Sequence, residues 1–88
     1  MAVVRLRGPL KDRAGGRAEH PTEAETVIAV LRGLEAQFPE LGGWILDERG
    51  EIRRHINVYV NGERGHEATP VGGDDRVEVL PAISGGAA

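Results

Sequence analysis

The fold of this chain is decided by the stretch Ile56-Asn57-Val58-Tyr59-Val60-Asn61-Gly62. Apolar residues at positions 56, 58 and 60 alternate with neighbours of the opposite face, which predicts a strand with one buried side. The dipeptide Asn61-Gly62 follows at once and is the strongest short sequence signal for a β-hairpin. We therefore expect the chain to reverse here and to return as a short strand near residues 64–67.

Another strand is predicted downstream of this hairpin. The run Gly72-Gly73-Asp74-Asp75 indicates a turn, and alternating valines then predict a last strand that ends at Pro81. Beside the glycines, the paired aspartates are interpreted as turn residues rather than as an acid–base pair. Residues 82–88 have nothing to pack with and are expected to form a mobile tail that carries Gly-Gly and Ala-Ala. The predicted organisation is one domain over residues 1–81 followed by this tail.

The N-terminal residues predict two more strands. Apolar and polar residues alternate over residues 2–7, which is typical of a half-buried strand, and Gly8-Pro9 then interrupts it. Gly15-Gly16 marks a turn, after which residues 17–20 give a weak signal for a returning strand.

Between these strands lies the best-marked element, a helix. Thr22 and Glu25 have the spacing of a capping box, in which each side chain bonds the backbone N–H of the other residue at the helix start. Pro39 is expected to end the helix near Gln37. The apolar stripe of this helix repeats at helical spacing and consists of Val27, Val30, Leu31, Leu34 and Phe38.

The segment after the helix predicts turns rather than a further element. Residues 41–46 are apolar but are broken by Gly42-Gly43, so a short irregular or 3₁₀ turn is expected there. Trp44 and Leu46 are expected to fill one end of the core, and residues 47–51 to form a polar turn.

The order of the predicted elements indicates the fold class. It runs strand, weak strand, helix, turn, strand, short strand, strand, so helices and strands do not alternate as they do in parallel βαβ folds. We therefore expect an α+β fold in which one main helix packs across a mixed sheet of four to five strands. This is the β-grasp arrangement of ubiquitin.

The composition indicates a small domain with an aliphatic core and no catalytic apparatus. Only 3% of the 88 residues are aromatic, and cysteine is absent, which excludes disulfides, cysteine zinc sites and thiol nucleophiles. No Ser-His-Asp constellation or phosphate-binding loop is present, so no catalytic residue is assigned and no enzyme is expected. His20, His55 and His66 show no recognisable ligand spacing and are interpreted as surface residues rather than as a metal site.

The charge pattern argues against nucleic acid and membrane partners. The net charge is −3, and acids and bases are interspersed without the basic stripe typical of nucleic-acid-binding modules. No run approaches the ~20 apolar residues that span a bilayer. Arg5 and Arg7 stand where a signal peptide would be apolar, so a cytoplasmic protein is expected.

The C-terminal third of the chain resembles a known family. The residues that carry the resemblance are Asn57-Val58-Tyr59-Val60-Asn61-Gly62-Glu63 and Gly73-Asp74-Asp75-Arg76-Val77-Glu78-Val79-Leu80-Pro81-Ala82-Ile83-Ser84-Gly85-Gly86. They are similar to the bacterial sulfur carriers, which include the molybdopterin synthase small subunit, the thiamine sulfur carrier and the cysteine-biosynthesis carrier. The last of these branches is the most similar.

The resemblance implies a function for the last glycine. An ATP-dependent activating enzyme of the ubiquitin type adenylates the Gly86 carboxylate, and sulfur then replaces AMP to give a thiocarboxylate. A synthase that holds the acceptor takes this sulfur, so the chain is a co-substrate, and it binds no cofactor itself. Ser84 and Gly85 thread the tail into the partner, where glycine leaves room that a Cβ would occupy.

One feature departs from the simplest family pattern, because Ala87-Ala88 follows the glycines. The carboxyl of Gly86 is then held in a peptide bond. We expect a precursor that a zinc metalloprotease of the JAMM type cleaves between Gly86 and Ala87, with a neutral extension or cloning remnant as the alternative.

The resemblance also implies a docking surface and leaves rival functions open. Leu80, Tyr59 and Ile83 are expected to contact the partner, Leu80 and Tyr59 on the sheet face away from the helix. A ubiquitin-like modifier that is conjugated through Gly86 to target lysines is the strongest alternative. A β-grasp binding module without tail chemistry is a third. The pathway that receives the sulfur stays open among cysteine, molybdopterin, thiamine, thiolated nucleosides and sulfur-containing natural products.

Overall fold

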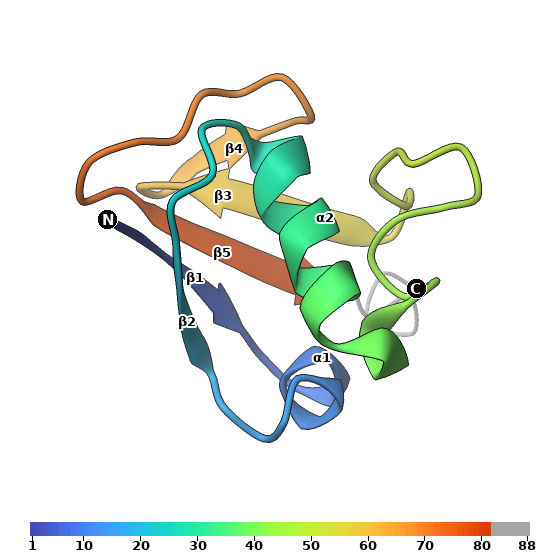
Figure 1. Cartoon of the computed structure of the whole chain (residues 1–88). Coiled ribbons are helices and arrows are strands. Elements are labelled where there is room, and N and C mark those ends of the chain that lie inside the picture. The colour runs from blue at the N-terminus through green and yellow to red at the C-terminus, as the bar shows by residue number, and fades with distance from the viewer. Residues whose placement is uncertain (82–88) are drawn as a thin grey trace, which may run out of the picture.

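The computed structural model describes residues 1–81 of the chain. This part contains five strands, one long helix and two short helices (Figure 1). In chain order the elements are β1 (Ala2–Leu6), α1 (Pro9–Arg13), β2 (Glu19–Thr22), α2 (Val27–Gln37), the 3₁₀ helix η1 (Pro39–Leu41), β3 (Ile56–Val60), β4 (Glu63–Gly65) and β5 (Arg76–Pro81).

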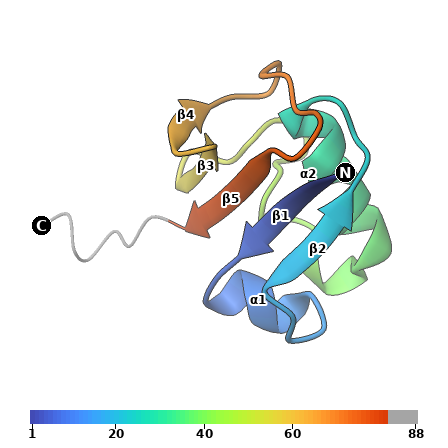
Figure 2. The ribbon, with the colours of Figure 1, turned by 90° about the vertical axis from the view of Figure 1, so that its left-hand side faces the viewer.

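The strands form a single mixed sheet in the order β2-β1-β5-β3-β4. β1 and β5 run parallel, whereas the pairs β1 with β2, β3 with β5, and β3 with β4 are antiparallel. Figure 2 shows the strands side by side with α2 behind them. The predicted β-grasp fold, with one main helix across a mixed sheet, is confirmed.

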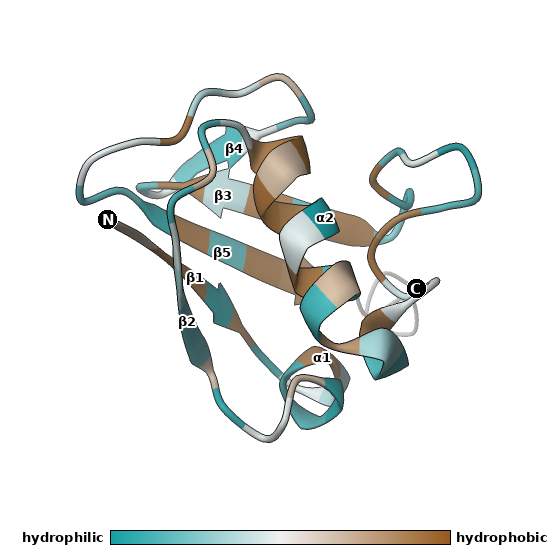
Figure 3. Ribbon diagram, viewed as in Figure 1, coloured by the Kyte–Doolittle hydropathy of each residue, from teal (hydrophilic) through white to brown (hydrophobic). Residues whose placement is uncertain are grey.

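The core lies between α2 and one face of the sheet. Because Val4 pairs with Val77 and Val58 with Val79, the valines of three strands point to the same side. Apolar residues recur along α2 and along the strands behind it (Figure 3). The predicted helical stripe is confirmed, since its first four residues are at most 4% exposed and Phe38 packs partly buried against them. Burial of this kind contributes about 25 cal/mol per Å² of apolar surface removed from water.

The start of α2 differs from the prediction. The N-cap is Thr26, whose Oγ1 accepts a hydrogen bond from Ala29 N at 3.3 Å, while Thr22 ends β2 and its hydroxyl accepts from Ala24 N. The first helical N–H groups donate to distant carbonyls, Val27 N to Thr69 O at 3.0 Å and Ile28 N to Glu67 O at 3.1 Å. The helix start therefore combines a local N-cap with two acceptors that are far away in the sequence. The residues between β2 and α2 carry the chain from the sheet edge to the helix layer.

This difference gives a first testable result. We expect Thr26→Ala to lower the free energy of unfolding by about 1 kcal/mol, because the helix loses its N-cap. Glu25→Ala changes an exposed side chain and serves as the control, with an expected effect within about 0.5 kcal/mol. Urea unfolding of both variants measures the effects, and equal losses would mean that the capping box operates after all.

A short helix was not predicted after the first strand. Gly8 has a φ of 61°, which bends the chain away from β1, and Pro9 then occupies the first position of α1, where its missing N–H costs nothing. Leu10 and Ala14 are buried at 1% and 0% exposure. The short helix α1 therefore forms where Leu10 and Ala14 can be buried at one end of the core.

The prediction that Trp44 fills the core is wrong. Trp44 is 40% exposed, and the Arg13 guanidinium lies 3.8 Å above its ring centroid. Ile45 and Leu46 are buried instead, and Glu35 Oε2 accepts hydrogen bonds from both of their backbone N–H groups. These two hydrogen bonds hold the backbone of Ile45 and Leu46 against α2, while the indole of Trp44 lies outside the core. Leu46 is confirmed as a core residue.

Candidate functional site

The candidate site begins where β5 ends. Ile83, Ser84, Gly85, Gly86 and Ala87, which include the predicted attachment, threading and processing residues, lie outside the described residues. The structure describes the strand from which they continue. β5 lies in the middle of the sheet between β1 and β3, and its last residue, Pro81, pairs with Ile56 of β3.

The two described residues of the predicted docking surface share one sheet face. Asn57 pairs with Leu80, and Tyr59 pairs with Glu78. Since opposite residues of a strand pair point to the same side, Tyr59 and Leu80 both lie on the face away from the buried valines and α2. Both are half-buried. We call this side, with its neighbours on β1 and β2, the open face.

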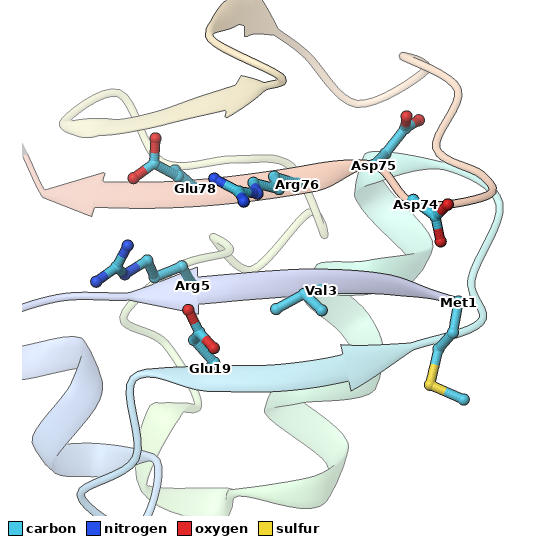
Figure 4. Close-up of a pocket in the computed structure, with 8 residues that line it drawn as sticks. All are labelled: Met1, Val3, Arg5, Glu19, Asp74, Asp75, Arg76 and Glu78. Carbon is cyan, nitrogen blue, oxygen red and sulfur yellow. The ribbon is translucent and has the colours of Figure 1, made fainter.

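The open face is strongly charged at the end far from Pro81, where acidic side chains outnumber arginines. A hollow of about 430 Å³ lies there, and Figure 4 shows Arg5 of β1 between Glu19 of β2 and the β5 pair Arg76 and Glu78. Arg7 and Glu78 form an ion pair at 3.0 Å, and both side chains are at least a third exposed. Exposed pairs of this kind contribute at most about 1 kcal/mol.

A hydrogen-bonded clamp sets the start of β5. The Asp75 carboxylate accepts hydrogen bonds from Asn61 Nδ2 at 2.9 Å and from Gly72 N at 3.0 Å, and Asn61 Oδ1 accepts from Arg76 N at 2.9 Å. Asn61 has a φ of 53°, as the predicted hairpin turn requires. These two donors, Asn61 first and Gly72 second, lower the pKa of Asp75 below its ordinary value of 3.8. The interpretation of Asp75 as a turn residue is confirmed, while its bond to Asn61 was not visible in the sequence.

The clamp predicts a pH dependence of stability. The pKa of Asp75 is lower in the folded chain than in the unfolded chain. Asp75 therefore adds fully to the free energy of unfolding at pH values above its unfolded-state pKa. This stabilisation is lost as the pH falls through the folded-state pKa. We therefore expect Asp75→Asn to be less stable than the natural chain at neutral pH, and the difference to shrink below about pH 4. Asp74→Asn is the control at the neighbouring exposed position. Urea unfolding at a series of pH values measures this difference, and one that stays constant down to pH 2 contradicts the clamp.

The histidines do not gather into a site. His20 is 3% exposed, its Nε2 lies 2.9 Å from the Arg17 carbonyl oxygen, and its ring meets that of Phe38 edge-on. The prediction of a surface position is therefore wrong for His20, which helps to pack β2 against the end of α2. Within residues 1–81 no three His, Cys, Asp or Glu side chains are arranged to hold a metal ion. No helix in this part of the chain has the length and apolar character needed to cross a membrane.

Comparison with known proteins agrees with this geometry. The sequence matches the ThiS family over residues 4–86, which is nearly the whole chain. The chain belongs to the ThiS family. The matched range ends on Gly86, so the two alanines stand beyond it.

Named relatives place this ThiS-family chain near carriers and modifiers. It is 32% identical over 83 residues to the sulfur carrier protein CysO of Mycobacterium tuberculosis, covering 88% of this chain and 89% of the relative. It is 38% identical over 65 residues to small archaeal modifier protein 3 of Haloferax volcanii, covering 69% and 70% of the two chains. A chain from the Amycolatopsis orientalis BexX/CysO complex superposes with a TM-score of 0.84 at 25% identity, covering 94% of this chain and 97% of that one. The chain is thus a sulfur carrier or ubiquitin-like protein, near CysO.

Proposed function

We propose that this protein is a sulfur carrier whose reactive group is the carboxyl of Gly86. The observation that carries the proposal is the family match, which runs from β1 through the whole domain and stops on Gly86. The end of β5 supports it, because the central strand of the sheet delivers the chain to this segment. The match to CysO favours an acceptor on the route to cysteine.

The proposed chemistry has two substitutions, the first at phosphorus and the second at the acyl carbon of Gly86. A carboxylate oxygen of Gly86 attacks the α-phosphorus of ATP and forms an O–P bond. The bond between the α-phosphorus and the bridging oxygen breaks, and pyrophosphate leaves. Hydrosulfide from the sulfur donor of the activating enzyme then attacks the acyl carbon, a C–S bond forms, AMP leaves, and loss of the sulfur-bound proton gives the thiocarboxylate. The chain contains no cysteine, so the sulfur has no thiol of this protein on which to travel.

The chain acts as a co-substrate of three enzymes in this proposal. A JAMM-type metalloprotease removes Ala87-Ala88, an activating enzyme of the ubiquitin type uses ATP on Gly86, and a synthase accepts the sulfur. Tyr59, Leu80 and Ile83 contribute contacts, with Ser84 and Gly85 as the threaded segment. The relative from A. orientalis, which is seen in complex with BexX, supports docking of such a carrier on a partner. We place these steps in the cytoplasm.

A modifier function is the second candidate, because small archaeal modifier protein 3 is also a relative. In that case the activated carbonyl of Gly86 forms an isopeptide bond with a target lysine. The chain itself holds only Lys11 as an internal acceptor.

Mass spectrometry of the protein isolated from its own cells tests both candidates. A C-terminal Gly86 with sulfur in place of one oxygen supports the carrier. After trypsin cleavage at Arg76, branches of residues 77–86 on lysines of other proteins, without the sulfur form, support the modifier and overturn the proposal. Protein from cells that lack the activating enzyme is the control, and it is expected to show neither product.

A further inference from the structure

A basic hollow lies between β4 and the segment that precedes β3. It has a volume of about 190 Å³ and an apolar floor that includes Ile56 and Val58. Its charged lining comes from two separate stretches of the chain and comprises Arg53, Arg54, Arg64, His66 and Glu67.

The positive charge of this hollow is poorly compensated within the described chain. The ion pairs of residues 1–81 involve Arg7 and Arg49, and none involves an arginine of the hollow. The single acid of the lining, Glu67, already accepts a hydrogen bond from Ile52 N at 3.0 Å. Arg53 Nε is buried and has no partner in the described part. A chain of net charge −3 thus gathers three arginines around one opening, which matches an anionic partner.

The hollow is also close to the end of the described chain. Ile56 in its floor pairs with Pro81, the last described residue. Gly86 is the fifth residue after Pro81, and five residues of extended chain reach at most about 18 Å. A protein that holds Gly86 in its active site therefore comes within reach of this edge of the sheet.

The exposure of the arginines favours a large partner over a small ion. Arg54, Arg64 and His66 are exposed and only Arg53 is half-buried, so no enclosed cage for a free anion is present in residues 1–81. Exposed basic groups around an apolar floor suit a protein surface that brings carboxylates to the rim.

We propose that the hollow of Arg53, Arg54, Arg64 and His66 docks an acidic segment of the activating enzyme that acts on Gly86. This inference rests on the proposed function and adds the chemistry of the partner surface. The aspartate and glutamate side chains of that segment pair with the exposed arginines, and this orients the carrier while its last residues enter the active site. Charge pairs of this kind act mainly on encounter and on salt dependence.

The test uses a chain that ends at Gly86 and the activating enzyme from the same genome. Pyrophosphate exchange measures kcat and the KM for the carrier. The double variant Arg54→Gln/Arg64→Gln is expected to raise the KM for the carrier roughly tenfold at low salt, with kcat unchanged, and to flatten the salt dependence of kcat/KM. Arg54→Lys/Arg64→Lys is expected to restore most of the KM. Lys11→Gln/Arg32→Gln removes the same charge from α1 and α2, away from the hollow, and is expected to leave the KM within about twofold of the natural value.

The outcomes separate this inference from the function on which it rests. If the natural Gly86-ended chain gives no exchange, the proposed function fails. If that chain is active and the Arg54→Gln/Arg64→Gln variant has the same KM and salt dependence, the docking surface is wrong. It is also wrong if the control variant changes the KM and the salt dependence by the same amount. Thermal unfolding of every variant must match the natural chain. Inorganic phosphate is the other probe: a rise in Tm that the double glutamine variant abolishes would assign the hollow to a free anion and overturn the proposal.

Discussion

A chain that ends at Gly86 is expected to form an acyl-adenylate with the activating enzyme, whereas the 88-residue chain is expected to give no detectable product. In the full chain the Gly86 carbonyl is an amide, which has no oxygen that can attack ATP. The terminal carboxylate is that of Ala88, displaced by two residues or about 7 Å of extended chain. A displacement of that size removes the reacting group from a site that requires near-contact geometry.

Pyrophosphate exchange with the purified enzyme measures this difference. A chain that ends at Gly85 is the matched control, because it also has a free glycine carboxylate but is one residue short, and it is expected to be at least a hundredfold less active. Exchange with the untrimmed chain at the rate of the trimmed one would show that Ala87-Ala88 needs no removal. Treatment of the full chain with the processing protease is expected to restore activity.

The second large effect separates the two faces of β5. Val79→Asp places a carboxylate at a position with 0% exposure, among the buried valines of the sheet and the residues of α2. A buried charge without a partner costs more than about 4 kcal/mol, which is comparable with the whole stability of a small domain. We expect this variant to be unfolded at room temperature by circular dichroism.

Leu80→Asp is the matched control one residue further on. Leu80 is half-buried on the open face, so the variant is expected to fold with a loss of about 1 kcal/mol or less. Because Leu80 belongs to the proposed docking surface, kcat/KM of the Gly86-ended form with the activating enzyme is expected to fall tenfold or more. If Leu80→Asp keeps full activity, the open face is not the contact surface near β5. If Val79→Asp stays folded, the described packing is wrong.

The strands could be predicted because each depends on a local pattern. β3, its hairpin turn at Asn61, and β5 with its end at Pro81 lie where alternation and turn residues indicated them. The inward valines followed from that alternation. The face of Tyr59 and Leu80 followed from it as well, since a period of two fixes which side chains share a side.

The features that sequence patterns missed depend on contacts between distant segments. The start of α2 is set by carbonyls of Glu67 and Thr69, some forty residues away, so the nearer Thr22 and Glu25 gave a false boundary. Trp44 lies outside because Glu35 holds the backbone of the following residues. The basic hollow joins residues 52–56 to residues 64–67, which come together only through the hairpin register and therefore form no pattern that the sequence shows.

The central position of β5 has a mechanical consequence. Force applied to the chain beyond Pro81 acts along the strand, and the hydrogen bonds to β1 on one side and to β3 on the other resist it in shear. Bonds loaded in shear must give way together, whereas an edge strand such as β4 could be peeled off one bond at a time. In the proposed function, this arrangement lets an enzyme pull on the chain beyond Pro81 and release it again without unfolding the domain.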